Sequence, residues 1–229
     1  MMTVNEDRLA RDAGEWRNTT IAIEAFKKSR SQPHDVAIYL EDEPDATYGA
    51  IAEEALRLIA ALRGLGLSAG DVISFQFPNW REGAVVDIAA AALGLVVNPI
   101  VPIYRDAELR FILGDAASKL ILIPDQHRSI DYVNMISRLR PELPHLQHVV
   151  TLRATAEYPN TIQYEQLIKC EPADESSLPT IDPNSIKCRL YTSGTTGFPK
   201  AVLHSHNTLT RILDNTSDHS GTNLSLIHI

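Results

Sequence analysis

The sequence predicts an α/β fold with mainly parallel sheets flanked by helices. Short runs rich in Val, Ile and Leu alternate along the chain with longer stretches in which apolar residues recur at helical spacing. Glycine and proline stand at many of the boundaries, where they end helices or turn the chain. Because strands that alternate with helices are joined by crossover connections, this order favours a mainly parallel sheet.

Helix caps and apolar spacing locate the elements of the first half. Thr47 is expected to cap a long amphipathic helix, and Gly64 and Gly66 are expected to end it. The alanine-rich segment 80–93 is apolar on nearly every side, which predicts a buried helix that ends at Gly94. Further expected elements are one or two helices within residues 5–31, with Thr19 or Thr20 as a cap, and strands at 36–40, 71–77 and 96–100.

The second half continues this alternation. Helices are expected at 106–113 and 130–139, strands at 119–123 and 148–152, and a short helix at 161–168. Residues 170–185 are rich in Pro, Asp, Glu and Ser, a composition typical of a linker. Strands at 186–191 and 201–206 follow, and a helix is expected to begin at Asn207.

Composition and charge exclude several classes of function. The chain has 229 residues, of which 44% are apolar and 22% charged, as in a soluble globular protein of one or two domains. Its net charge of −8 argues against a nucleic acid or an anionic membrane as a partner. Any phosphate site must therefore be a local positive feature of an acidic protein.

The amino terminus, the longest apolar segment and the cysteines indicate a cytoplasmic protein without stable membrane insertion. Residues 1–17 lack the apolar core of a signal peptide. The apolar stretch 83–103 contains polar residues and two prolines, which predicts a buried segment and not a membrane span. Cys170 and Cys188 form no CxxC motif and have no histidine at metal-ligand spacing, so no zinc site is expected.

The segment 190–200, Leu-Tyr-Thr-Ser-Gly-Thr-Thr-Gly-Phe-Pro-Lys, has the composition of a phosphate-binding loop. Gly194 and Gly197 permit positive φ and a close approach, so consecutive backbone N–H groups can converge on one anion. Lys200 adds a positive charge on a long stem. The short hydroxyl donors are Thr192, Ser193, Thr195 and Thr196. A plain Gly/Ser/Thr linker is the alternative, but it would not lie between two predicted strands and end in Pro-Lys.

The spacing of the loop excludes three common nucleotide-binding motifs. A Walker A loop requires GxxxxGK[ST], whereas here Gly197 precedes Lys200 by three positions and Ala201 follows the lysine. The GxGxxG fingerprint of dinucleotide-binding folds is absent from the ends of the predicted strands. The glycine-rich loop of protein kinases fails on the same glycine spacing.

The sequence Tyr-Thr-Ser-Gly-Thr-Thr-Gly-Phe-Pro-Lys closely resembles the phosphate loop of the adenylate-forming enzymes. This superfamily of AMP-binding enzymes includes acyl- and aryl-CoA ligases, peptide-synthetase adenylation domains and luciferases. The resemblance covers most of residues 20–215, with Thr47-Tyr48, Gly70-Asp71 and Pro78-Asn79 in the family's order. Within the family, residues 98–113 are most similar to acyl-CoA ligases (acyl-CoA synthetases).

The resemblance implies a reaction in two halves. A carboxylic acid reacts with ATP, in the presence of Mg2+, to give an acyl-adenylate and pyrophosphate, and a thiol then displaces AMP. The thiol is usually that of coenzyme A, but an adenylation domain that loads a carrier protein is an alternative. The residues implied to grip the β- and γ-phosphates are Thr192, Ser193, Gly194, Thr195, Thr196, Gly197 and Lys200.

Two positions depart from the family's usual pattern. Arg189 stands where an apolar residue is common, and Ala201 replaces the usual glycine after the lysine, where little effect is expected. Because Arg189 alternates with Lys187, both side chains are expected on one exposed strand face and not at the phosphate.

Several other polar or aromatic residues are expected to have ordinary structural roles. His204 and His206 would share a strand face, but no third metal ligand lies nearby, so packing or solvent contact is expected. The acidic pair Glu53-Glu54 and the acidic run 42–45 are expected to be solvated. Trp16 and Trp80 are expected to pack in the core.

The resemblance also implies that the family's catalytic and metal-binding residues lie downstream of this loop. We therefore expect residues 1–223 to be the amino-terminal portion of the large adenylate-forming domain, inactive alone. A non-catalytic remnant that binds a nucleotide or a partner is the alternative. Residues 224–229, Leu-Ser-Leu-Ile-His-Ile, are the translation of CTGTCTCTTATACACATC, the mosaic end of transposase-based sequencing libraries, and are expected to be adapter sequence.

Sequencing the locus from genomic DNA tests this expectation. The natural reading frame should continue past Asn223 with a different sequence, and a Tyr-Gly-x-Thr-Glu-like motif should follow further downstream. A stop codon directly after Ile229 in the native gene would contradict it.

Overall fold

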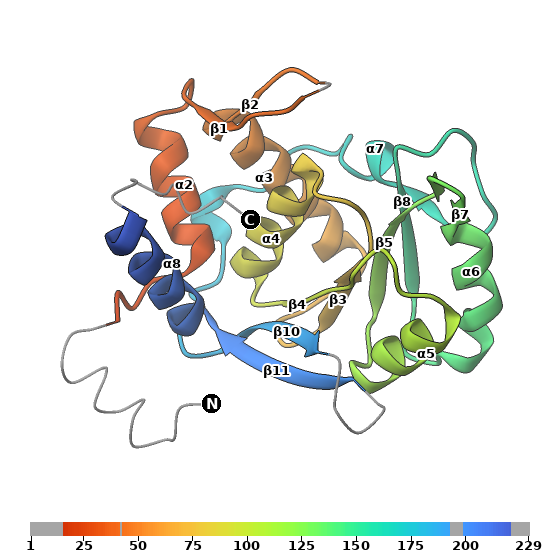
Figure 1. The fold of residues 1–229 in the computed structure, drawn as a ribbon. Coiled ribbons are helices and arrows are strands. Elements are labelled where there is room, and N and C mark those ends of the chain that lie inside the picture. The colour runs from red at the N-terminus through yellow and green to blue at the C-terminus, as the bar shows by residue number, and fades with distance from the viewer. Residues whose placement is uncertain (1–15, 42, 193–198, 221–229) are drawn as a thin grey trace.

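The computed structural model describes residues 16–41, 43–192 and 199–220, and its main feature is a seven-stranded sheet (Figure 1). The strand order is β11-β10-β4-β3-β5-β8-β9. All neighbouring strands are parallel except β10 and β11, which form an antiparallel hairpin, so the predicted mainly parallel α/β fold is confirmed. The strands are β3 (Val72–Phe75), β4 (Val96–Pro99), β5 (Leu120–Pro124), β8 (His148–Leu152), β9 (Ile162–Gln163), β10 (Ile186–Thr192) and β11 (Lys200–Ser205).

Helices cover both faces of this sheet. One core contains α2 (Ile21–Ser31), α3 (Tyr48–Gly64) and α4 (Arg81–Leu93), and the other contains α5 (Asp106–Asp115) and α6 (Tyr132–Leu139). Alternate residues of β5 belong to different cores, Leu120 to the first and Ile121 to the second, as expected for opposite sheet faces. The remaining elements are α7 (Tyr164–Leu167), α8 (His206–Ser220), 3-10 turns at Arg140–Glu142 and Glu175–Ser177, and two small hairpins, β1 (Val36–Ile38) with β2 (Ala46–Thr47) and β6 (Gln126–His127) with β7 (Ile130–Asp131).

Three of the caps expected from the sequence are found at the ends of helices. Thr20 and Thr47 are the N-caps of α2 and α3, and each side-chain hydroxyl accepts a hydrogen bond from a backbone N–H of the first turn. Gly94 ends α4 in the left-handed conformation, with φ of 69°. A Cβ there would also lie 2.9 Å from Ile181, so a larger residue would meet both strain and a steric clash. The alanine-rich helix α4 is buried, as predicted.

The linker-like segment 170–185 lies along α3. Arg57 of α3 donates to the carbonyl of Cys170 (2.8 Å), and the N–H of Ala173 donates to the carbonyl of Leu56 (3.0 Å). Six residues further along α3, Arg63 donates to the carbonyl of Ser177 (3.0 Å). The segment therefore leads the chain across α3 to the start of β10.

The structure of residues 161–168 differs from the predicted short helix. These residues form the short strand β9 and the single helical turn α7.

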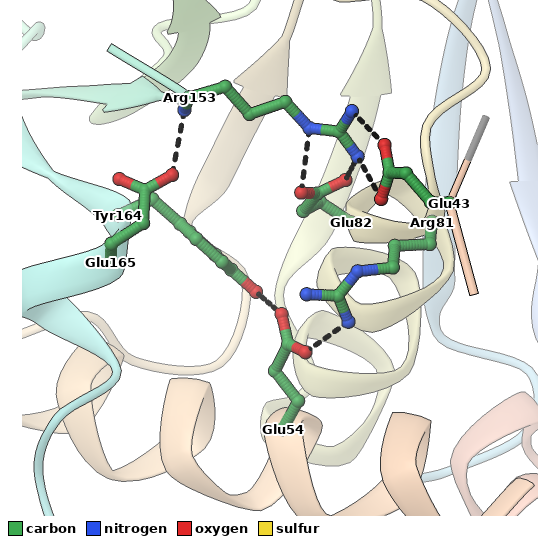
Figure 2. A network of polar contacts seen from close by, with 7 residues as sticks. All are labelled: Glu43, Glu54, Arg81, Glu82, Arg153, Tyr164 and Glu165. Atoms are coloured by element: carbon green, nitrogen blue, oxygen red, sulfur yellow. Dashed lines mark hydrogen bonds and ion pairs between the residues drawn. The ribbon is translucent and has the colours of Figure 1, made fainter. Parts of the chain in front are cut away.

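A polar network fastens the helices of the first core to the ends of β8 and α7 (Figure 2). Arg153, which follows β8, donates two hydrogen bonds to Glu82 of α4 (3.0 and 2.9 Å) and pairs with Glu43. Its guanidinium lies 4.4 Å from the centre of the Trp80 ring. Burial alone would lower the pKa of Arg153, but the two carboxylates outweigh it and the pKa is raised.

The second half of this network corrects the expectation that Glu54 is solvated. Glu54 is mostly buried, accepts a hydrogen bond from the Tyr164 hydroxyl (2.7 Å) and pairs with Arg81 (Figure 2). Burial, followed by the charge of Glu54, raises the pKa of Tyr164, which therefore stays a neutral donor. Glu53 is exposed, as expected, and pairs with Arg57.

A bulge at the start of β10 explains why Lys187 and Arg189 do not share an exposed face. Ile186 pairs with Ser205 and Cys188 with His204, so Lys187 is an extra residue in the β10 strand. Lys187 is completely buried and pairs with Asp87 of α4, whereas Arg189 pairs with Asp115 of α5. The predicted exposed face is therefore wrong, because the bulge turns Lys187 towards the first core.

His206, the first residue of α8, is buried beside this ion pair. Its exposed fraction is 1%, and its Nδ1 has no hydrogen-bond partner within the part of the chain that the structure describes. Burial, followed by the charge of Lys187, lowers the pKa of His206 to about 4, against smaller opposite effects of Asp87 and Asp182. The folded protein therefore holds this histidine neutral.

The bond between Arg153 and Glu82 predicts a large stability effect. Arg153→Met should lower the free energy of unfolding by about 3 kcal/mol, because it leaves the buried Glu82 carboxylate without its partner. Urea denaturation at pH 7 measures the change. Arg138→Met, which removes an exposed pair with Asp106, should cost less than about 1 kcal/mol. Equal effects of the two substitutions would contradict a special role for the buried pair.

The pKa of His206 predicts a pH effect on stability. The pKa is lower in the folded protein than the unfolded value of about 6.5, so the unfolded state takes up the proton first as the pH falls. The free energy of unfolding should therefore decrease between pH 6.5 and pH 4, by up to about 3 kcal/mol from this group. His206→Gln should show a shallower decrease in urea midpoint over that range. Parallel curves for the two proteins would contradict the assignment.

Candidate phosphate-binding site

The hairpin of β10 and β11 holds the two ends of the predicted phosphate loop together. Thr192 is the last residue of β10 and Lys200 the first of β11, and the two are directly paired across the hairpin. The Thr192 hydroxyl donates to the carbonyl of Lys200 (3.4 Å). Five of the predicted site residues lie outside the described part of the chain, and their roles stay predictions: Ser193, Gly194, Thr195, Thr196 and Gly197.

Thr192 and Lys200 present their side chains on one side of the hairpin. Directly opposed residues of an antiparallel pair point to the same face, and both residues are exposed. A hydroxyl donor and an ammonium group therefore lie at the mouth of the connection, one on each strand. The structure thus brings together the first and the last of the predicted phosphate-binding residues.

The loop starts at the carboxyl edge of the parallel sheet. β10 is parallel to β4, and β4 to β3, so residues that follow these strands lie at the same edge. Ligands of open α/β sheets bind outside this edge. Gln76, which follows β3, is buried and donates to the carbonyls of Val101 (3.1 Å) and Tyr104 (3.0 Å). Gln76 thereby ties the chain that follows β4 to the end of β3.

Asp115, the last residue of α5, contacts the strand that leads into the loop. Its Oδ2 accepts hydrogen bonds from Nη2 of Arg189 (2.8 Å) and from the hydroxyl of Tyr191 (2.5 Å). Burial, together with the hydrogen bond to Asp115, raises the pKa of Tyr191. Asp115 is not among the site residues predicted from the sequence. A carboxylate in the last turn of a helix is disfavoured by the helix dipole, and that position is a signal that could have identified it.

The histidines and cysteines form no metal site in the described residues, where no cluster of three possible ligands occurs. His204 lies in β11 opposite Cys188, whereas His206 belongs to α8, so the two do not share one strand. Lys200 is the first residue of β11 and His206 follows the last one, so the two lie about 20 Å apart at the usual rise of a strand. Burial raises the pKa of the Cys188 thiol to about 11, so it stays protonated at neutral pH.

None of the helices in residues 16–41, 43–192 and 199–220 combines the length and the apolar character that a membrane crossing requires. The apolar stretch 83–103 instead forms α4 and β4. Their residues lie mainly in the core around the sheet, as expected from the sequence.

Three comparisons relate this chain to known proteins. A medium-chain fatty-acid–CoA ligase of Escherichia coli K12 is 31% identical over 213 residues, which is 91% of this chain and 37% of the relative. A salicyl-AMP ligase / salicyl-S-ArCP synthetase of Mycobacterium tuberculosis is 30% identical over 208 residues, 88% of this chain and 36% of the relative. The structure of acetoacetyl-CoA synthetase from Streptomyces lividans matches with a TM-score of 0.79 and 25% identity, over 90% of this chain and 33% of that one.

These matches agree in the part of the chain that they cover and in the family that they indicate. The chain spans slightly more than a third of the length of these two curated relatives. Residues 25–226 match the family described as AMP-binding enzymes. That match includes the hairpin and the connection between Thr192 and Lys200, on which the sequence resemblance rests most heavily. The chain therefore belongs to the family of AMP-binding enzymes.

Proposed function

We propose that residues 1–223 form the amino-terminal part of the adenylation domain of an ATP-dependent acid–thiol ligase. The complete protein activates a small carboxylic acid as an acyl-adenylate and then transfers the acyl group to the thiol of coenzyme A. Residues 224–229 are adapter sequence in this proposal. It is supported by the family match over residues 25–226 and by relatives that are named as CoA ligases.

The assignment of the phosphate site is supported mainly by the position of the two residues that flank the loop. Thr192 and Lys200 are paired across the mouth of the loop, at the carboxyl edge of a parallel sheet. This arrangement sets a hydroxyl donor and a cation on either side of a glycine-containing connection. Converging N–H groups, hydroxyls and one ammonium group are the donors that a polyphosphate chain requires.

In the proposed reaction the loop binds the leaving group, pyrophosphate. An oxygen of the substrate carboxylate forms a bond to the α-phosphorus of ATP, and the bond from that phosphorus to the oxygen bridging to the β-phosphate breaks. Negative charge develops on the departing pyrophosphate, and Lys200 and the loop donors stabilise it where it forms. In the second half the thiol sulfur attacks the acyl carbon, the bond to AMP breaks, and the thiol proton passes to solvent.

Mg2+ and coenzyme A belong to this proposal through the family. Mg2+ supplies charge neutralisation to the phosphates of the nucleotide. No candidate set of acidic ligands for it occurs among the described residues, so its protein ligands are proposed to lie elsewhere in the complete chain. A cytoplasmic location is proposed from the composition of the chain.

Two other functions remain as alternatives. The relative from Mycobacterium tuberculosis is named as a salicyl-S-ArCP synthetase as well as a salicyl-AMP ligase, so a carrier-protein thiol could replace coenzyme A as the acceptor. A remnant that binds a nucleotide without catalysis would keep the fold and lose the reaction. The first alternative differs from the proposal in the acceptor thiol, and the second in the absence of the reaction, and both differences can be measured.

The proposal predicts carboxylate-dependent ATP–pyrophosphate exchange by the full-length protein. A panel of medium-chain, aromatic and short acids should contain at least one that supports exchange. Lys200→Ala should lower the exchange rate by about 100-fold, because one cation is removed from the developing pyrophosphate charge.

Lys169→Ala is the matched control. Lys169 is an exposed lysine that donates to Gln166, far along the chain from the loop, and its removal should leave exchange unchanged. Absence of exchange with every acid would contradict the ligase proposal and favour the non-catalytic alternative. Exchange without subsequent formation of an acyl-CoA would favour a carrier-protein acceptor.

A further inference from the structure

The end of β10 has few backbone bonds to the rest of the sheet. In the described residues its only pairing with β4 is at Cys188 and Val97, whereas its pairing with β11 continues to Thr192. The last residues of the strand therefore belong to a hairpin that extends past the main sheet. Backbone pairing within this hairpin holds the two ends of the loop to each other but does not hold them to the domain.

Side-chain contacts with α5 supply that attachment. Arg189 and Tyr191 are two positions apart, so they project from the same face of β10. Both donate to Oδ2 of Asp115, and the ring of Tyr191 meets the ring of Phe111 edge-on at 6.4 Å. Phe111 and Asp115 are four positions apart and therefore share one face of the helix. Two residues of α5 thus hold two residues of β10.

We propose that Asp115 is a positioning residue for the phosphate loop, acting through Arg189 and Tyr191 on the strand end that leads into Thr192. The inference rests on the proposed function of the loop. We call these three residues and Phe111 the α5 clamp. Thr192 projects from the other face of β10, so the clamp acts on the loop through the backbone and does not contact the nucleotide.

The charges within the clamp agree with this role. Asp115 lies at the end of the helix where the helix dipole disfavours a carboxylate, and the guanidinium of Arg189 offsets this effect. Arg189 also stacks 5.6 Å from the centre of the Tyr191 ring. Because Arg189 pairs with Asp115, its charge lies next to α5, on the face of β10 opposite to the one from which Thr192 projects.

The clamp is expected to affect the loop more than the stability of the fold. The side chain of Asp115 is 44% exposed and that of Arg189 is 24% exposed. Partly exposed ion pairs contribute little to folding free energy. A small displacement of a catalytic loop, by contrast, can change rates by one or two orders of magnitude. Variants of Asp115 should therefore fold normally and still have a changed KM for ATP.

Steady-state ATP–pyrophosphate exchange on the full-length protein tests the clamp. Asp115→Ala should raise the KM for ATP about tenfold, lower kcat, and leave the KM for the carboxylic acid unchanged. Asp115→Asn, which keeps an acceptor for the Tyr191 hydroxyl, should recover part of the loss. A variant that merely unfolds in part would lower kcat and keep both KM values.

A double-substitution cycle tests whether the residues act as one unit. Tyr191→Phe removes the hydroxyl bond and keeps the ring contact with Phe111, so it should show a smaller loss than Asp115→Ala. The double variant should then be no worse than Asp115→Ala alone, because both changes remove the same bond. Fully additive losses would overturn the clamp. Asp106→Ala, which removes an exposed carboxylate at the other end of α5, is the control and should keep the wild-type KM for ATP.

The outcomes separate the clamp from the proposed function. If the wild-type protein exchanges and Asp115→Ala shows wild-type KM and kcat, the clamp is overturned and the ligase assignment stands. If the wild-type protein exchanges with no acid, the ligase assignment is overturned and the clamp with it. Thermal unfolding of each variant confirms that the compared proteins are folded.

Discussion

The position of the loop-bearing hairpin depends on the buried ion pair between Lys187 and Asp87. The ammonium group of Lys187 is completely removed from solvent, and a charge in that environment requires a partner. Asp87 supplies the partner from α4, the helix that lies within the first core. Removing either residue would leave the other charge buried and unpaired, a more costly state than the loss of an exposed pair. The start of β10 is therefore tied to the middle of the domain.

The bulge at Lys187 lets one strand reach helices on both faces of the sheet. At the bulge β10 contacts α4 through Lys187, and after it the strand contacts α5 through Arg189 and Tyr191. A regular strand would direct Lys187 and Arg189 to the same side. Two helices thus hold β10 near its two ends, and the loop begins one residue beyond the second attachment.

Local signals predicted much of the fold. The caps at Thr20, Thr47 and Gly94, the buried alanine-rich helix and the order of strands and helices depend on residues close together in the chain. The loop's family was indicated by the resemblance of its residues, read in order, to the phosphate loop of the adenylate-forming enzymes. Of the predicted site residues, the structure describes Thr192 and Lys200 and places them together.

Pairings between distant residues could not be predicted in this way. The burial of Glu54 depends on Tyr164, 110 positions away, and that of Lys187 on Asp87, 100 positions away. Asp115 contacts β10 only because α5 and the hairpin meet in space. The linker-like segment 170–185 is ordered by bonds to α3 that its composition does not indicate.

Amide hydrogen exchange on the full-length protein shows whether the connection from Thr192 to Lys200 binds the phosphates of ATP. N–H groups that donate to a phosphate exchange more slowly, so MgATP should protect peptides that contain residues 192–200. Peptides from α2 and the β1–β2 hairpin should be unaffected. Binding of MgATP without protection of residues 192–200 would show that this connection does not hold the phosphates.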